Sequence, residues 1–202
     1  MRIIKLKNMR LTRAALDEAV AVLRAGGVVA FPTETAYGLA ADPKNAAAVA
    51  KIFRIKGRAK DNQLPLVAAS IDQMRATAFL RGRLKTLVEK HWPGPLTLVL
   101  PAKAGALVGD PTTVAVRVPG SALVRRMCEE FGAPVTATSA NLSGHPALYS
   151  GAAVRREFAL RRHQPDLLLD AGRIPMRPPS TIVTQESDHF KVLRKGPIRV
   201  RD

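Results

Sequence analysis

The sequence has too few cysteines to form an internal disulfide. Its single cysteine, Cys128, follows Met127 in an apolar, helically spaced stretch, so we expect a buried thiol and not a nucleophile. A chain without disulfides suits a reducing compartment. Residues 1–10 lack the apolar stretch of a secretion signal, and no apolar run approaches the ~20 residues that cross a bilayer. These absences predict a cytoplasmic protein with no membrane contact.

Several common catalytic signatures are also missing. The sequence has no G-x-x-x-x-G-K-[ST] loop and no G-x-G-x-x-G after a strand pattern, so the two common nucleotide folds are not indicated. It has no G-x-S-x-G turn for a serine nucleophile. The four histidines do not have the spacing of metal ligands, so we expect no metal held by the protein.

Acidic residues are scarce beside basic ones. The chain has 32 Lys and Arg against 16 Asp and Glu, a net charge of +16, and the excess is spread over both halves of the chain. A basic folded surface attracts phosphates, in a nucleotide or along RNA, although a general preference for basic surfaces would also explain it. Aromatic residues make up only 4%, which leaves few platforms for stacking single-stranded RNA.

Helix and strand patterns alternate along the chain. We expect helices over residues 12–25, 45–53, 122–131 and 150–160, with one or two more over 71–91 that break near Gly82. Short apolar runs predict strands at 28–31, 64–69, 96–100, 113–118, 134–138, 166–169, 181–183 and 190–193. This alternation predicts a single α/β domain with a large, twisted, mixed parallel and antiparallel sheet flanked by helices.

Three polar segments are candidate sites. Residues 31–39 carry an apolar strand into hydroxyls, a carboxylate and a phenol; Lys56 and Arg58 flank Gly57 at the end of a helix pattern; residues 137–144 follow a strand with hydroxyls and an amide. Ligands gather where strands end in polar loops, and two cations around a glycine can hold a polyphosphate. Each segment also fits a purely structural turn or helix end.

Arg117 lies inside an apolar run, between Val116 and Val118. A buried guanidinium needs a partner, for which a ligand carboxylate is one candidate.

Taken in order, these segments resemble the threonylcarbamoyl-AMP synthase (YrdC-like) family. The resemblance consists of PTET at 32–35 with YGL at 37–39, KGR at 56–58, WPGPLT at 92–97, VRVP at 116–119, TSAN at 138–141 with SG at 143–144, STIV at 180–183, and LR at 193–194 with Gly196. It covers residues 10–198, so we expect one YrdC-like domain with short terminal extensions, in the short form of the family.

The resemblance implies a positively charged concave face and a nucleotidyltransferase. Such an enzyme makes threonylcarbamoyl-AMP and pyrophosphate from L-threonine, bicarbonate and ATP. The product feeds N6-threonylcarbamoyladenosine formation at position 37 of tRNA, through separate transfer proteins. Mg²⁺ would arrive with ATP, without a protein cage, and tRNA is a further candidate partner for the concave face.

By family position, Lys56, Arg58, Ser139 and Asn141 would form the catalytic, ATP-binding set, with Arg194 along the nucleotide. Thr33, Asn62, Arg117 and Ser180 would contact threonine or the carbamate. The main alternative is a non-catalytic protein of the same fold that binds double-stranded RNA or tRNA. Retention of Lys56, Arg58, Ser139 and Asn141 together favours the enzyme, because RNA binding alone would not require that set.

Overall fold

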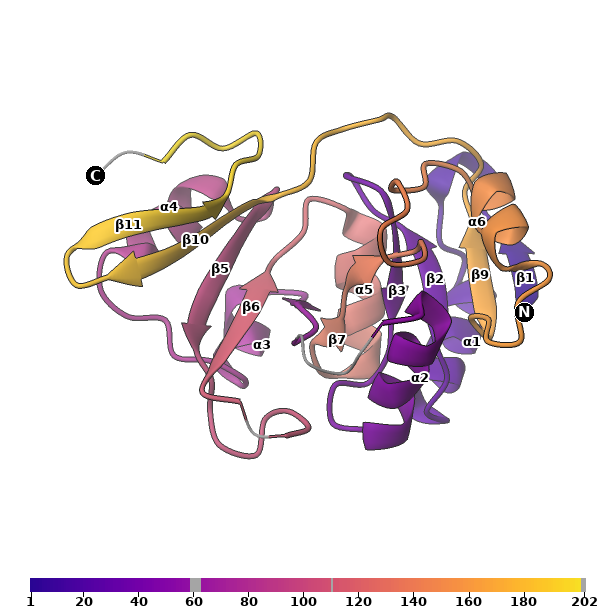
Figure 1. Cartoon of the computed structure of the whole chain (residues 1–202), viewed down its shortest axis with the longest axis horizontal. Helices are drawn as coiled ribbons and strands as arrows, with labels where there is room; N and C mark the ends of the chain where they lie inside the picture. The colour runs from indigo at the N-terminus through magenta and orange to yellow at the C-terminus, as the bar shows by residue number, and fades with distance from the viewer. Residues whose placement is uncertain (59–62, 110, 201–202) are drawn as a thin grey trace.

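The computed structural model describes residues 1–58, 63–109 and 111–200 (Figure 1). The helices are the 3-10 turn η1 (Lys7–Met9), α1 (Arg13–Arg24), α2 (Ala46–Lys56), α3 (Ile71–Arg75), α4 (Leu84–His91), α5 (Ala122–Phe131) and α6 (Gly151–Phe158). The strands are β1 (Arg2–Lys5), β2 (Val29–Pro32), β3 (Tyr37–Ala40), β4 (Leu66–Val67), β5 (Leu96–Pro101), β6 (Thr113–Arg117), β7 (Val135–Thr136), β8 (Thr138–Ser139), β9 (Leu167–Asp170), β10 (Thr181–Glu186) and β11 (His189–Arg194).

The strands form two mixed sheets, so the α/β fold class is confirmed and the expected large sheet is divided in two. One sheet has five strands in the order β1-β9-β2-β3-β8, and the other has six in the order β11-β10-β5-β6-β4-β7. The short segment 135–139 joins them: β7 pairs with β4 in one sheet, and β8 pairs with β3 in the other. Figure 1 shows the two sheets on either side of this segment.

The five-stranded sheet is covered by helices on both faces. Leu167 and Leu169 of β9 join the core with α1 and α5, while Leu168 joins the core with α2 and α6. Side chains alternate between the faces of a strand, and burial of both faces accounts for continuous apolar runs such as residues 28–31. Cys128 on α5 lies in the first of these cores with no exposed area, which confirms the buried thiol.

The six-stranded sheet has one covered face and one open face. Leu96 and Leu98 of β5 and Val116 of β6 pack with α3, α4 and Trp92. The residues that alternate with these along each strand, such as Thr97 on β5 and Arg117 on β6, face the opposite side and line a cleft. The period of two therefore explains why an arginine interrupts an apolar strand.

Local sequence signals place most of the helix ends. Thr12 caps α1 by accepting the Ala15 N–H at 3.2 Å, and Asn45 caps α2 through Ala47 and Ala48. Helix α5 covers the expected residues 122–131 and ends at Gly132, whose φ of 86° few other residues adopt. None of the helices within residues 1–58, 63–109 and 111–200 combines the length and apolar character that a membrane crossing requires.

Two strands were not expected. The sequence predicts a strand that ends at residue 31 and runs into a polar turn, but β2 extends to Pro32 and Tyr37–Ala40 forms β3. Strand β1 pairs in parallel with β9, so the sheet includes residues upstream of the expected domain start at residue 10. Both strands are short, and their partners lie elsewhere in the chain or across a turn.

Candidate active site between the two sheets

A cleft of about 760 Å³ lies between the sheets. One wall comes from the β2–β3 turn, the end of α2 and residues 137–149, and the other comes from β4, β5, β6, β10 and β11. Of the nine residues predicted for the site, eight lie on this cleft or on its walls: Thr33, Lys56, Arg58, Arg117, Ser139, Asn141, Ser180 and Arg194. The ninth, Asn62, lies outside the described residues.

Lys56 is the last residue of α2 and is 4% exposed. Gly57 then turns the chain at a φ of 60°, and Arg58 follows on the cleft wall. The Lys56 Nζ donates to the carbonyl oxygens of Ser139 at 2.7 Å and Asn141 at 2.9 Å. Burial, and after it the positive charge of Arg58, lower the pKa of Lys56, the negative charge of Glu157 raises it, and together they leave the pKa at about 8.

Ser139 and Asn141 reach the cleft because β8 joins the five-stranded sheet. Ser139 pairs with Gly38 of β3, where a Cβ on residue 38 would come within 3.2 Å of Phe31 and 3.3 Å of the Thr138 carbonyl. Asn141 is 6% exposed, and its Nδ2 donates to the carbonyls of Leu142 and His145. The Asn141 Oδ1 has no hydrogen-bond donor in the described structure, so a ligand donor could satisfy it.

Arg117 finds its partner within the protein. Its Nη1 lies 3.0 Å from Oε1 of Glu34 in the β2–β3 turn, and the side chains are 10% and 16% exposed. These two atoms are fully buried and do not have hydrogen-bond geometry, so their attraction is that of an ion pair. Glu34 Oε2 also accepts the Ser121 N–H at 3.3 Å. Sequence reasoning placed a carboxylate in this turn but did not pair it with Arg117.

Arg194 and Ser180 form a second polar group on the same wall. The Arg194 Nη2 lies 2.9 Å from the Ser180 Oγ, and its Nε donates to the Ser180 carbonyl at 3.0 Å. The Ser180 Oγ is also 2.8 Å from Thr97 Oγ1, a contact that the sequence did not suggest. Partial burial lowers the pKa of Arg194, and repulsion from nearby Arg117 lowers it as well. The guanidinium groups of Arg194 and Arg117 therefore lie near each other, and Glu34 pairs with Arg117.

Thr33 is 5% exposed and holds the β2–β3 turn. Its Oγ1 accepts N–H groups from Thr35 at 3.0 Å and Ala36 at 3.1 Å, and it donates to the Ala36 carbonyl at 2.7 Å. This geometry is that of a hydroxyl-stabilised turn, and the same residue lines the cleft.

The described side chains of the cleft are suited to anions, and they do not form a set of metal ligands. Lys56, Arg58, Arg117, Arg177 and Arg194 all line it. Among the described residues, no three His, Cys, Asp or Glu side chains come together as metal ligands. The described site is therefore suited to phosphate and carboxylate groups held by cations, hydroxyls and one amide.

The chain is similar to known proteins in both sequence and fold. The family model Sua5–YciO–YrdC, described as telomere recombination, matches residues 21–196. A threonylcarbamoyl-AMP synthase of Bacillus subtilis is 40% identical over 188 residues, which cover 91% of this chain and 54% of that protein. A synthase of the same name from Thiobacillus denitrificans is 40% identical over 171 residues, covering 81% and 87%. This chain thus spans about half the length of the B. subtilis protein.

Solved structures of similar fold include P. abyssi Sua5 complexed with L-threonine. It matches with a TM-score of 0.87 and 34% identity, over 97% of this chain and 58% of that one. E. coli YciO matches with a TM-score of 0.85 at 21% identity, over 97% and 96% of the two chains, and supports the fold alone.

Proposed function

This chain belongs to the Sua5–YciO–YrdC family, and on that premise we propose that it is a threonylcarbamoyl-AMP synthase. It would convert L-threonine, bicarbonate and ATP into threonylcarbamoyl-AMP and pyrophosphate. One observation carries the proposal: two polar groups line a single cleft. Lys56 and Asn141 lie on one wall, and Arg117, Ser180 and Arg194 lie on the other. Similarity to the named synthases favours this activity over RNA binding without catalysis.

The chemistry needs no protein nucleophile. The amine of threonine attacks the carbon of bicarbonate, with loss of water, or that of carbon dioxide, with loss of a proton, and either route leaves a carbamate. A carbamate oxygen then bonds to the α-phosphorus of ATP, and the bond from that phosphorus to the bridging oxygen breaks to release pyrophosphate. Positioning and charge neutralisation are the main demands on such a site.

The nucleotide half of the site would be the wall around Lys56. Lys56 and Arg58 would neutralise the triphosphate, as a point charge and a planar fork. Ser139 and Asn141 would hold the reacting groups, with the unpaired Oδ1 of Asn141 free to accept from them. Arg194 would lie along the nucleotide. Mg²⁺ would come bound to the ATP phosphates, which supply the oxygen ligands that this ion prefers.

The amino-acid half would be the opposite wall. Arg117 and Ser180 would meet the carboxylate or carbamate, with Thr33 lining the pocket and Asn62 completing it. Arg117 and Arg194 together carry two positive charges, whereas the facing carboxylate that contacts Arg117 is Glu34. One further carboxylate would balance the charge of this group, which suits the carboxylate of threonine.

The cellular role follows from the same proposal. The product would be consumed by proteins that transfer the threonylcarbamoyl group to adenosine 37 of tRNA, so we place the protein in the cytoplasm. The cationic concave cleft is the part of the surface that tRNA would approach. We treat residues 10–198 as one catalytic domain, to whose five-stranded sheet β1 adds an edge strand.

The direct test is pyrophosphate release by the purified protein. We expect release from ATP only when both L-threonine and bicarbonate are present. Lys56→Ala and Ser139→Ala should each reduce the rate by at least about a hundredfold, since each removes a group that acts on developing charge. Arg54→Ala is a matched control, because Arg54 is an exposed cation in the same turn of α2. Release without threonine, or full activity in both site variants, would refute the assignment.

A further inference from the structure

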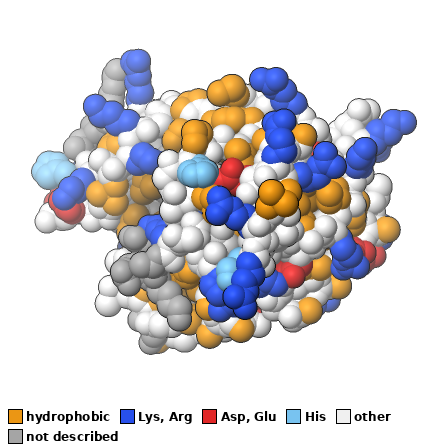
Figure 2. Space-filling model, turned by 45° about the vertical axis from the view of Figure 1, so that its right-hand side comes forward, with side chains coloured by type: hydrophobic (Ala, Val, Ile, Leu, Met, Phe, Trp, Pro, Cys, Tyr) orange, Lys and Arg blue, Asp and Glu red, His pale blue; other side chains and the backbone are white. Residues whose placement is uncertain are grey.

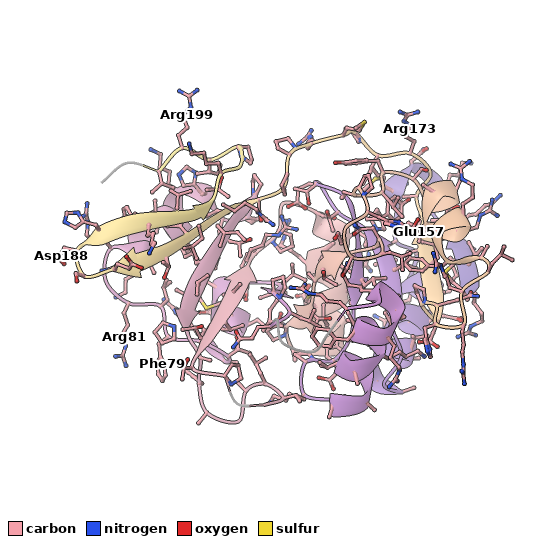
Figure 3. The ribbon with its side chains drawn as sticks, viewed as in Figure 1. Phe79, Arg81, Glu157, Arg173, Asp188 and Arg199 are labelled. Atoms are coloured by element: carbon pink, nitrogen blue, oxygen red, sulfur yellow. The ribbon has the colours of Figure 1, made fainter. Side chains whose placement is uncertain are left out.

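The loop between β8 and α6, residues 140–149, is fixed from outside the cleft by Glu157. Glu157 lies on α6, and its Oε1 accepts the Leu142 N–H at 3.1 Å and lies 2.8 Å from the His145 Nδ1. Its side chain is 17% exposed, against 50% for His145. Figure 3 shows Glu157 on the side of α6 that faces the body of the protein, while Arg173 projects outward.

The same loop is fixed from inside by Lys56. The Lys56 ammonium donates to the carbonyls of Ser139 and Asn141, and the Lys56 carbonyl accepts the Ser143 N–H at 2.9 Å. The Asn141 side chain closes the loop onto the His145 carbonyl. The segment that carries Asn141 is therefore held between a lysine on one side and a carboxylate on the other.

Glu157 also acts on Lys56 through its charge. Burial and Arg58 both lower the pKa of Lys56, and the negative charge that raises it again is Glu157. Among the described residues, the charged or titratable neighbours of Glu157 include His145, which is in contact with it, and Arg156 and Arg161, which line a pocket beside α6 together with it. Basic side chains predominate over acidic ones on the face shown in Figure 2.

We propose that Glu157 is a positioning residue for Lys56 and Asn141: its carboxylate accepts the N–H of the 141–142 peptide, whose carbonyl oxygen accepts from the Lys56 ammonium. This rests on the proposed function, in which Lys56 and Asn141 hold ATP. Before ATP arrives, the Lys56 Nζ donates to the carbonyls of Ser139 and Asn141, with the Ser139 hydroxyl at 3.5 Å as a third oxygen. A neutral amine would turn a lone pair toward one of these oxygens, so loss of the proton would release the loop.

The role can be tested without any ligand, by titrating the lysine directly. In protein labelled with carbon-13 lysine, the Cε resonance of Lys56, assigned by its absence in Lys56→Arg, should titrate near pH 8. Glu157→Gln keeps an oxygen acceptor for Leu142 but loses the charge. We expect it to lower the midpoint by roughly 0.5 to 1 pH unit, the size of a screened interaction between partly buried charges. Glu157→Asp, which keeps the charge, should restore most of the shift.

Glu18→Gln is the matched control. It removes a carboxylate that pairs with Arg2 at 2.6 Å on the far side of the sheet, and it should leave the Lys56 midpoint unchanged. An unchanged midpoint in Glu157→Gln would overturn the proposal, as would an equal shift in Glu18→Gln. Because no substrate is present, these outcomes are independent of whether the protein is a synthase.

A second measurement connects the residue to catalysis. The kcat/KM for ATP reports groups in the free enzyme, so Glu157→Gln should nearly match the wild type at pH 6 and lie about twofold to fivefold below it at pH 8. A loss that is equal at every pH would show a merely structural role and overturn the electrostatic part. Absence of activity in the wild type would refute the proposed function while leaving the titration result standing.

Discussion

The ion pair between Glu34 and Arg117 links the two sheets, and its removal provides the most informative perturbation of the fold. Glu34 comes from the turn after β2, and Arg117 ends β6 in the other sheet. Glu34→Gln keeps the shape of the side chain and removes the negative charge. A buried guanidinium would then remain beside Arg194, which already repels it.

The expected loss of stability follows from the burial of the pair. Breaking a buried ion pair by removing one partner costs about 3 to 5 kcal/mol in general. Here the Arg117 side chain is 10% exposed and the Glu34 side chain 16%, and Arg117 borders an open cleft that water can enter. We therefore expect about 2 to 3 kcal/mol for Glu34→Gln, or a fall in Tm of roughly 5 to 10 °C for a chain of this size.

The assay is a double-mutant cycle in urea, followed by circular dichroism. Glu34→Gln and Arg117→Gln are each compared with the double variant, and we expect a coupling energy of at least ~1 kcal/mol. Glu18→Gln is the surface control: its partner Arg2 is 68% exposed, so the cost should be no more than about 0.5 kcal/mol. A cost below ~0.5 kcal/mol for Glu34→Gln, or strict additivity in the cycle, would refute this reasoning.

Three further predictions concern pH, reactivity and packing. Since the pKa of Lys56 is lowered to about 8, chiefly by burial, the ammonium is present below that pH and is lost above it. ATP affinity measured by calorimetry should therefore be greatest at pH 6 to 7 and fall through pH 8, and an affinity that does not change with pH would contradict this prediction. Burial raises the pKa of Cys128 to about 12 and leaves it no exposed area, so a thiol reagent such as DTNB should react only after denaturation, and rapid labelling of native protein would count against the described core. Gly196→Ala would place a Cβ 2.4 Å from the Thr181 backbone nitrogen, whereas Gly120→Ala meets nothing closer than 3.7 Å; we expect the first to lower the unfolding free energy by about 1 to 3 kcal/mol and the second to cost clearly less, as measured by urea unfolding.

Elements with strong local signals were predicted well. Helix α1 begins after Thr12 and α5 covers residues 122–131, because caps, glycine stops and helical spacing act within one or two turns. The strands β3 and β1 were missed for the opposite reason. Tyr37–Ala40 is fully buried and is stabilised by pairing with β2 and β8 and by bonds from the Tyr37 hydroxyl to residues 171 and 172.

The residues of the site show the same difference between what local patterns predict and what long-range contacts decide. A helix end with two cations pointed to Lys56 and Arg58, a polar segment after a strand pointed to the stretch that holds Ser139 and Asn141, and the structure brings these positions to one cleft. The partners of these residues could not be predicted, since Lys56 bonds to carbonyls more than 80 positions away and Arg117 pairs with Glu34 from the other sheet. Sequence reasoning also passed over Glu157, which no motif singles out.

The sequence by itself determined the fold class, most of the helices and strands, the family and the chemical character of the site, because local spacing and residue type carry that information. Only the tertiary structure decided that the sheet is divided in two, that Glu34 neutralises Arg117 and that Glu157 supports the Asn141 loop. Those contacts join residues far apart in the chain, and their energies come from burial and from charges brought together in a medium of low dielectric constant, which no local pattern records.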